Sequence, residues 1–241
     1  VGTSLVGFGV RSCTVPGSFG IPQDANVVYD VQELDVYDPI TPRALFRSWK
    51  RASGQSAHEG HTISIFCPDI TSADVARLYG VGFVLEPSGD HGPKGTTFVE
   101  RIGGEALYRV PDSGAAIVVP LGRDGELPTA SAPGTPVRVV HPDSAKWKLT
   151  VDEATPQVLR LHLTDVPGWH ATIDGRPLHL KPFSAAMLQA RIPAGTHTVE
   201  LTYWPTTFSV GIAIAGLAIV SFVVTGIFLA IRRRDIEPAS S

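Results

Sequence analysis

The residues best suited to binding chemistry in this 241-residue chain lie just ahead of an expected helix: Asp35, Tyr37, Asp38 and Arg43. Carboxylates accept hydrogen bonds from sugar hydroxyls, and an aromatic ring can stack on the face of a sugar. The group is therefore a candidate glycan contact. A local role is the simpler alternative, because an aspartate before a proline, as in Asp38-Pro39, is a common turn residue.

Tryptophans supply a second candidate surface. Trp147, Trp169 and Trp204 can be read as an aromatic platform for a sugar, with Trp169 as the candidate contact. Packing in a core and anchoring at a membrane explain the same residues more simply, because tryptophan combines a large apolar body with one polar N–H group.

Metal, nucleotide and hydrolase chemistry find no support. His58 and His61 are the one close histidine pair, and they flank Gly60 in a loop rich in Ser and Gly. The two cysteines, Cys13 and Cys67, are too few and too far apart for a zinc site of the usual paired spacing. Neither Gly-x-Ser-x-Gly nor Gly-x-x-x-x-Gly-Lys occurs. We therefore expect no metal and no bound cofactor. A formal net charge of -3 likewise gives no indication of nucleic acid binding.

An uncharged segment near the C-terminus predicts how the chain meets a lipid bilayer. Residues Val210 to Ile231 carry no charge, and a helix of 22 residues covers about 33 Å at about 1.5 Å per residue. That length matches a hydrocarbon core of ~30 Å. A buried helix of a soluble protein would carry a polar stripe. The segment is therefore expected to be a transmembrane helix.

Charges and aromatic residues around this helix predict its orientation. Arg232, Arg233 and Arg234 follow it directly, and such charges stay on the cytoplasmic side during insertion. Residues 232–241 should form a cytoplasmic tail and residues 1–209 should lie outside the cytoplasm of a bacterial cell. Tyr203 and Trp204 would then sit at headgroup level as anchors.

An N-terminal part that lies outside the cytoplasm must be exported across the membrane. Residues 1–30 contain no basic segment followed by an apolar one, as a signal peptide would require. We therefore expect that membrane helices precede this chain in a longer protein. Small residues four apart, at Gly211 and Ala215 and again at Gly226 and Ala230, would let such helices approach closely. Outside the cytoplasm, Cys13 and Cys67 can form a disulfide or remain two buried thiols.

The soluble region divides at a segment rich in Pro, Gly and Ser over residues 128–136. Residues 1–127 are expected to form a small α+β unit with helices over Pro42–Ala52, capped by Thr41, and Ser72–Tyr79. Strands are expected over 82–85, 97–102, 106–110 and 116–119. Residues 137–205 are almost purely strand and turn, which predicts an antiparallel β-sandwich.

Two patterns in the second section carry that prediction. Leu159, Leu161 and Leu163 alternate with polar residues, which places the leucines on one buried face. Asp174-Gly175 predicts a type I′ hairpin, because both central residues must take positive φ. The fold class is thus mainly β: an α+β unit, an antiparallel sandwich and one C-terminal transmembrane helix.

Three stretches resemble a known family. The C-terminal end of the chain resembles that of YfhO-like bacterial membrane proteins in two segments and the membrane helix that follows them. The segments are Pro167-Gly168-Trp169-His170-Ala171-Thr172-Ile173-Asp174-Gly175-Arg176-Pro177 and Ile192-Pro193-Ala194-Gly195-Thr196-His197-Thr198-Val199-Glu200. Leu34 to Arg43 and Leu78 to Leu85 look like two upstream stretches of that family, although Val36, Gly80 and Gly82 replace its usual Gly, Asn and Arg.

The resemblance implies a protein similar to glycosyltransferases of the GT-C superfamily, which move a sugar from a polyprenyl-phosphate carrier to an acceptor outside the cytoplasm. Their catalytic acidic residues lie in an early outer loop that has no counterpart here. No catalytic residue carries over, and the chain alone is expected to be inactive. The expected role is accessory, with the lipid bilayer, neighbouring helices and a polyprenyl-linked sugar or envelope polysaccharide as partners. A non-enzymatic, membrane-anchored glycan-binding or scaffold module is the alternative.

Overall fold

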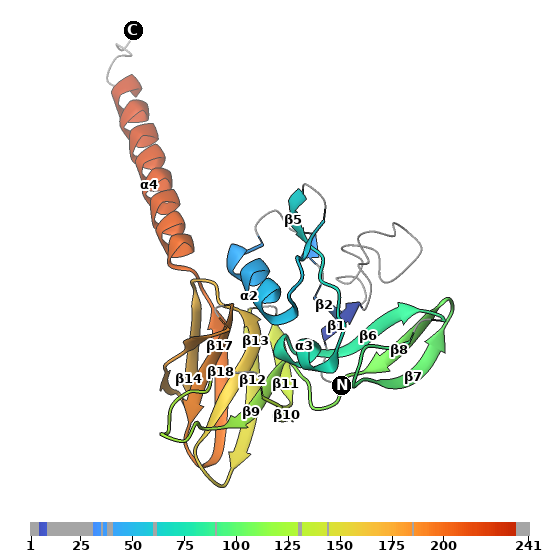
Figure 1. Ribbon diagram of the computed structural model, residues 1–241. Coiled ribbons are helices and arrows are strands. Elements are labelled where there is room, and N and C mark those ends of the chain that lie inside the picture. Colours follow the sequence, from blue (N-terminus) through green and yellow to red (C-terminus); the bar gives the residue numbers. More distant parts are fainter. Residues whose placement is uncertain are drawn as a thin grey trace, which may run out of the picture.

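The computed structural model describes residues 5–8, 31–34, 36–37, 41–59, 62–89, 91–129, 132–143, 145–184 and 186–234. These residues form an α+β unit, a β-sandwich and one long helix that projects away from the sandwich (Figure 1). The predicted fold class, mainly antiparallel β with a small helical part and an apolar C-terminal helix, is confirmed.

The α+β unit is built on a mixed five-stranded sheet. Its strand order is β2 (Gln32–Glu33), β1 (Leu5–Phe8), β6 (Val81–Pro87), β8 (Glu105–Arg109) and β7 (Thr97–Ile102). A smaller sheet contains β3 (Val36–Tyr37), β5 (Thr62–Phe66) and β4 (His58–Glu59). β7 and β8 are joined by a turn at Gly103-Gly104, where Gly103 takes φ 62°.

Two short helices complete this unit. α2 (Arg43–Ser53) has Pro42 at its N-cap position, so the helix begins one residue later than the sequence predicts, and Gly54 closes it at φ 76°. α3 (Ala73–Leu78) is capped by Ser72, whose side chain accepts a hydrogen bond from the Val75 N–H. Leu45, Phe46 and Trp49 form the buried face of α2.

The sandwich has two five-stranded antiparallel sheets. One has the order β10 (Thr135–Val137), β9 (Ala116–Pro120), β13 (Gln157–Thr164), β17 (Met187–Ile192) and β16 (Lys181–Phe183). The other has the order β11 (Val139–Asp143), β12 (Lys146–Glu153), β18 (Gly195–Tyr203), β14 (Trp169–Ile173) and β15 (Arg176–Leu178). Leu159, Leu161 and Leu163 lie in the core between the sheets, as their alternation predicts.

One expectation for this region is corrected. The strand over 116–119, which the sequence places with the first unit, is β9 of the sandwich and pairs with β13 and β10. On the outer face of β13, the Arg160 side chain is also buried: it stacks over the Phe183 ring at 4.0 Å and donates to the Pro128 carbonyl at 2.9 Å. The alternation within β13 cannot reveal this burial, because it depends on neighbouring segments that cover the outer face of the strand.

The α+β unit packs against this outer face. Trp49 and Tyr79 share one buried cluster with Phe183 and Met187 of the sandwich. The Tyr79 hydroxyl donates to Ser48 Oγ at 2.9 Å, and Ser48 Oγ lies 3.0 Å from Ser184 Oγ. Burial raises the pKa of Tyr79 to about 12, so the hydroxyl keeps its proton and this chain of hydrogen bonds persists at neutral pH.

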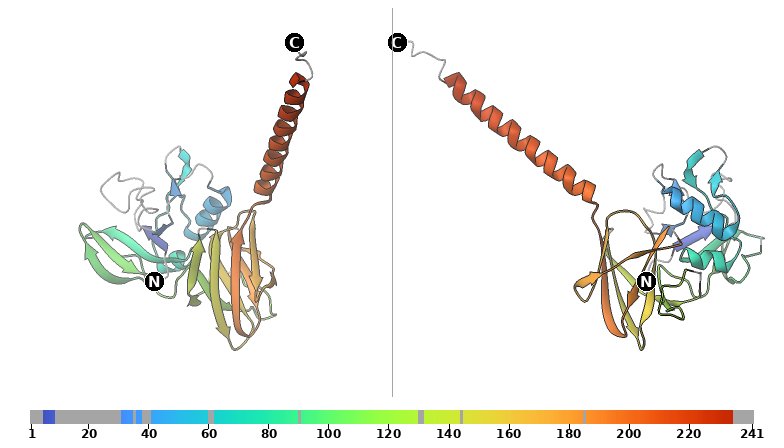
Figure 2. Two further views of the ribbon diagram at one scale, coloured as in Figure 1. Left: turned by 180° about the vertical axis from the view of Figure 1, so that it is seen from behind. Right: turned by 60° about the vertical axis from the view of Figure 1, so that its left-hand side comes forward.

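α4 (Thr206–Arg234) follows the sandwich directly, and its segment Thr206–Leu229 is long and apolar enough to cross a membrane. None of that segment is buried against the rest of the described molecule (Figure 2). An unburied apolar helix of this length needs lipid around it, since water would meet its whole apolar surface.

Candidate functional site

The end of the sandwich next to α4 gathers aromatic side chains from several strands and the start of the helix. We call this set, His141, Trp147, Trp169, Tyr203, Trp204 and Phe208, the α4-proximal aromatic cluster. The antiparallel register aligns Trp169 with Tyr203 and Trp147 with Leu201. Because paired residues point to the same face of a sheet, Trp147, Trp169 and Tyr203 close the inner face of the sandwich at this end.

Ring contacts run through the cluster without a break on the sandwich side. The Trp169 and Tyr203 ring centroids are 5.1 Å apart, Trp147 and Trp169 are 6.5 Å apart, and His141 lies 4.9 Å from Trp147. Such tilted and edge-on pairs are the geometries that aromatic rings prefer. Trp147 is buried, whereas Trp169 and Tyr203 are half-buried. The burial of Trp147 favours a role in core packing over a role in an exposed sugar platform.

A tight joint connects the sandwich to α4. The Trp204 backbone N–H donates to the Gly168 carbonyl at 2.8 Å. Gly168 takes φ 125°, and a Cβ at this position would lie 2.9 Å from Pro205 N and 3.0 Å from the Tyr203 ring. Only glycine therefore fits between β14 and the start of the helix.

On the helix side, the cluster is open to its surroundings. Trp204 packs edge-on against Phe208 at 4.9 Å and donates from Nε1 to Ser209 Oγ at 2.7 Å, and the two rings are about half exposed, at 48% and 51%. A large apolar ring with a polar N–H is suited to the boundary between lipid tails and headgroups. The joint thus presents two exposed rings where α4 leaves the sandwich.

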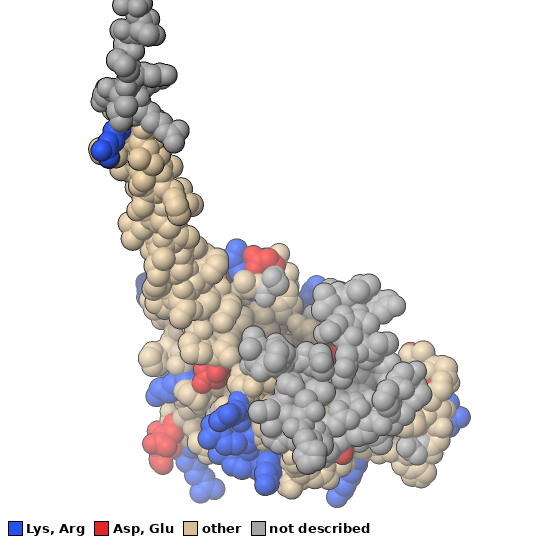
Figure 3. All heavy atoms as spheres, turned by 90° about the horizontal axis from the view of Figure 1, so that it is seen from above, with Lys and Arg blue, Asp and Glu red and all other residues tan. Residues whose placement is uncertain are grey.

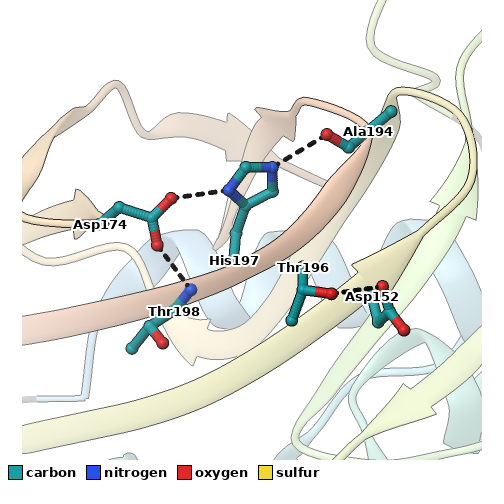
Figure 4. A network of polar contacts seen from close by, with 6 residues as sticks. All are labelled: Asp152, Asp174, Ala194, Thr196, His197 and Thr198. Atoms are coloured by element: carbon teal, nitrogen blue, oxygen red, sulfur yellow. Dashed lines mark hydrogen bonds and ion pairs between the residues drawn. The ribbon is translucent and has the colours of Figure 1, made fainter.

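At the opposite end of the same sheet, polar contacts fasten two turns together (Figure 4). His197 Nδ1 lies 2.6 Å from Asp174 Oδ2 and its Nε2 lies 3.0 Å from the Ala194 carbonyl. Asp174 also accepts from the Thr198 N–H at 2.9 Å, and Thr196 donates to Asp152 at 2.7 Å. Both ring nitrogens of His197 face acceptors, so the charged imidazolium satisfies both contacts.

These contacts shift the ionisation of both partners. The hydrogen bond to Asp174, followed by that to the Ala194 carbonyl, raises the pKa of His197. The hydrogen bonds from His197 and from the Thr198 N–H lower the pKa of Asp174. Asp174 and Gly175 take φ 49° and 77°, as a type I′ turn requires. The Asp-Gly signal predicted the turn, but not its link to His197.

Of the predicted glycan contacts, the structure describes the side chains of Arg43 and Trp169, so their grouping into one site stays a prediction. Arg43 is exposed on α2 of the α+β unit, whereas Trp169 belongs to the sandwich. Asp35 and Asp38 lie outside the described residues, and Tyr37 is described by its backbone alone. α2 also exposes Arg47, Lys50 and Arg51, and Lys and Arg side chains gather on the face of the molecule seen from above (Figure 3).

The remaining predicted residues fall into two groups. Arg232 is exposed at the end of α4, and Arg233 and Arg234 belong to the same helix by their backbone. Cys67 is buried and disulfide-bonded. Cys13 lies outside the described residues, so their pairing stays a prediction.

Sequence reasoning missed Gly168 as the residue that fixes the joint. The local signal was Pro167-Gly168 immediately before a strand, which is a turn dipeptide. Its contact with Pro205 depends on the pairing of β14 with β18, and no local pattern encodes that pairing.

Comparison with known proteins finds a family match for one part of the chain. Residues 131–215 match the family described as bacterial membrane protein YfhO, which confirms the resemblance over that region. The matched segment runs from just before β10 into the first third of α4, and so contains the joint and all six residues of the α4-proximal aromatic cluster. No curated protein and no solved structure matches the chain.

Proposed function

We propose that this chain, with its YfhO-like region over residues 131–215, is the extracytoplasmic C-terminal part of a larger membrane protein that transfers sugars. The chain itself holds no catalytic residue in this proposal. It orients an envelope glycan acceptor for a transfer reaction that uses a polyprenyl-phosphate sugar and takes place in the preceding membrane part.

The joint between β18 and α4 is the observation that carries this proposal. A sandwich that continues into a membrane helix through a glycine-fixed connection moves with that helix and stays at the bilayer surface. Exposed Trp204 and Phe208 suit the headgroup layer beside it. A lipid-linked sugar reacts at that same surface. A sandwich held there would therefore bind the acceptor close to the reacting sugar.

Orientation is tested by labelling one added cysteine at a time in intact bacterial cells with a membrane-impermeant maleimide. Thr155→Cys, in an exposed turn of the sandwich, should react in intact cells, whereas Ser241→Cys in the tail should react only after permeabilisation. The parent chain without either substitution gives the background from its own two cysteines. Labelling of the tail in intact cells, with a protected Thr155→Cys, contradicts the proposal.

The accessory role is separated from a free-standing glycan-binding module by the coding sequence upstream of Val1. Further membrane helices with an acidic first outer loop support the transferase, and a signal peptide directly before this chain supports the module. If the transferase is found, Gly168→Val in the complete protein should lower sugar incorporation into the envelope while leaving the amount of protein in the membrane unchanged.

A further inference from the structure

A cleft of about 380 Å³ lies where the α+β unit meets the sandwich. We call it the inter-unit cleft. Gly82, Phe83 and Arg109 line it from the first unit, and Pro136, Val137 and Arg138 line it from the sandwich. The loop from Asp112 to Ala115, which links β8 to β9, forms another part of its wall. Its volume falls within the range of ~300–1,000 Å³ that is typical of small-molecule sites.

The loop that walls the cleft is held in place from both sides. Arg77 of α3 donates to the Pro111 carbonyl at 3.3 Å, and Val110 N–H donates to the Gly82 carbonyl at 2.9 Å. From the sandwich, His162 contacts the Gly114 carbonyl through Nδ1 at 2.6 Å and the Ala115 carbonyl through its backbone N–H at 2.8 Å. A wall fixed by four hydrogen bonds is preformed, so a ligand would not have to order it.

The polar side chains of the cleft make no side-chain hydrogen bond or ion pair within the described structure. Arg109 and Arg138 are exposed, and neither guanidinium makes an ion pair or a side-chain hydrogen bond with another described residue. Ser113 Oγ is buried without a hydrogen-bond partner among the described residues. A buried hydroxyl without a partner costs free energy, and a bound ligand is one way to satisfy it.

These groups differ in what they recognise. Two guanidinium groups, one from each unit, provide paired donors for the oxygens of a carboxylate or a phosphate. The third charge, Asp112, would repel such an anion directly, but its oxygens accept hydrogen bonds from hydroxyl groups. Phe83 adds part of an aromatic ring, which suits the apolar face of a sugar. The set therefore fits a ligand that is anionic at one end and rich in hydroxyls elsewhere.

We propose that the inter-unit cleft binds an acidic sugar, a hydroxylated ring that carries one carboxylate or phosphate group. Arg109 and Arg138 hold the anionic group, and Asp112 and Ser113 bind the ring hydroxyls. The proposal deepens the proposed function by naming the class of glycan, and it rests on that function for the choice of a sugar over other anions. The site requires both units, since neither unit alone supplies both arginines.

Isothermal titration calorimetry of the full chain in detergent micelles at low salt tests this site. Glucuronate and glucose 1-phosphate are the two acidic probes, glucose is the neutral control, and inorganic phosphate is the control for simple anion binding. Acidic sugars should bind, while glucose should give no signal and phosphate should bind more weakly than glucose 1-phosphate. The difference between glucuronate and glucose 1-phosphate reports which anionic group the cleft prefers.

Arginine variants assign the binding to the cleft. Arg109→Gln and Arg138→Gln should each weaken binding about tenfold, as expected for loss of a charge-assisted hydrogen bond. Arg123→Gln, at an exposed arginine outside the cleft, should leave binding unchanged. Melting temperatures check folding, and Arg138→Lys, which keeps the charge, should retain more affinity than Arg138→Gln.

Four results would overturn the proposal: no binding of either acidic sugar, equal binding of glucose, phosphate binding as tight as glucose 1-phosphate, or unchanged binding in both Arg109→Gln and Arg138→Gln. The orientation test is independent of all four. Extracytoplasmic labelling without sugar binding would contradict the binding site in the cleft but not the proposed function. Sugar binding together with the opposite orientation would support the binding site in the cleft but contradict an envelope glycan as its ligand.

Discussion

His162 lies directly against Gly80, and this contact joins the sandwich to the α+β unit. A Cβ on residue 80 would lie 2.6 Å from the Cβ of His162 and 2.7 Å from its Nδ1. The imidazole therefore occupies the space that any other residue at position 80 would need. Gly80 also takes φ 73°, a conformation that favours glycine.

Gly80→Ala should destabilise the protein by at least about 3 kcal/mol, because left-handed strain and overpacking against His162 add together. Gly54→Ala is the matched control: Gly54 has φ 76° and no atom within 4 Å of the position that an alanine methyl would take, so it should lose only about 1 kcal/mol. Urea unfolding of the detergent-solubilised chain measures both. Equal losses in the two variants would show that His162 does not restrict residue 80.

The His162 contact should weaken in acid. Burial, assisted by the nearby Arg160 charge, lowers the pKa of His162 to about 4. A folded-state pKa below the unfolded value of 6.5 means that the unfolded chain binds the proton more tightly. The stability from neutral His162 is complete above pH 6.5 and falls as the pH drops toward 4, by about 3 kcal/mol in total.

His162→Asn separates this effect from other titrations. Since a carbonyl can only accept, His162 Nδ1 carries a hydrogen toward Gly114, and the Asn amide can donate from a similar position without taking up a proton. The variant should lose most of the decline in stability between pH 6.5 and pH 4 in urea unfolding at several pH values. An unchanged pH profile in His162→Asn would assign the decline to other groups.

Asp174→Asn should lower the pKa of His197 toward its ordinary value while the turn persists. Asn tolerates positive φ and can still accept from the Thr198 N–H, so the substitution removes the charge but not the hairpin. In the parent protein, the contribution of His197 is complete below its unfolded pKa and is lost as pH rises through its raised pKa. Asp174 contributes above its unfolded pKa and loses that contribution as pH falls through its lowered pKa.

An NMR titration of the His197 ring measures this change directly. The neighbouring exposed pair Lys148 and Glu200, with 2.8 Å between Nζ and Oε1, gives a control through Glu200→Gln, which should leave the His197 pKa almost unchanged. A His197 pKa that is the same in Asp174→Asn and in the parent would contradict the assigned cause.

Gly168→Val should loosen the joint between the sandwich and α4. The new side chain would strike Pro205 and Tyr203 and break the hydrogen bond from Trp204 N–H to the Gly168 carbonyl. Spin labels on the sandwich and on α4 should show a broader distance distribution in lipid nanodiscs. Gly89→Val, at φ 127° with no neighbouring atom within 4 Å, carries similar backbone strain and should leave the distribution narrow.

Local chemistry predicted much of the fold, because several elements depend on residues that are adjacent in sequence. Asp174-Gly175 sets its own turn, Ser72 caps its own helix, and the uncharged run before Arg232 defines α4. The partner of β9 could not be predicted in the same way, since Ala116 to Pro120 is an apolar run that suits either unit. The position of β9 depends on its pairing with β13, a strand that comes much later in the sequence.

The candidate sites were harder to predict for the same reason. Trp169, Tyr203 and Trp204 stand out by residue type, and their grouping follows from the pairing of β14 with β18. Arg109 and Arg138 give no local signal, because each is one arginine among many strand and loop residues. They come together only when the two units pack, and the contact of His162 with Gly80 arises from that same packing.

The position of β9 has a practical consequence for anyone who wishes to produce the sandwich by itself. A polypeptide that starts after the proline-rich segment, at residue 137, would lack the strand between β10 and β13. It would then expose an unsatisfied strand edge and the apolar patch around Val158, and should precipitate or stick to itself. By contrast, a single protease cut between 121 and 134 leaves both new ends hydrogen-bonded within one sheet, so the nicked molecule should stay whole until it is denatured.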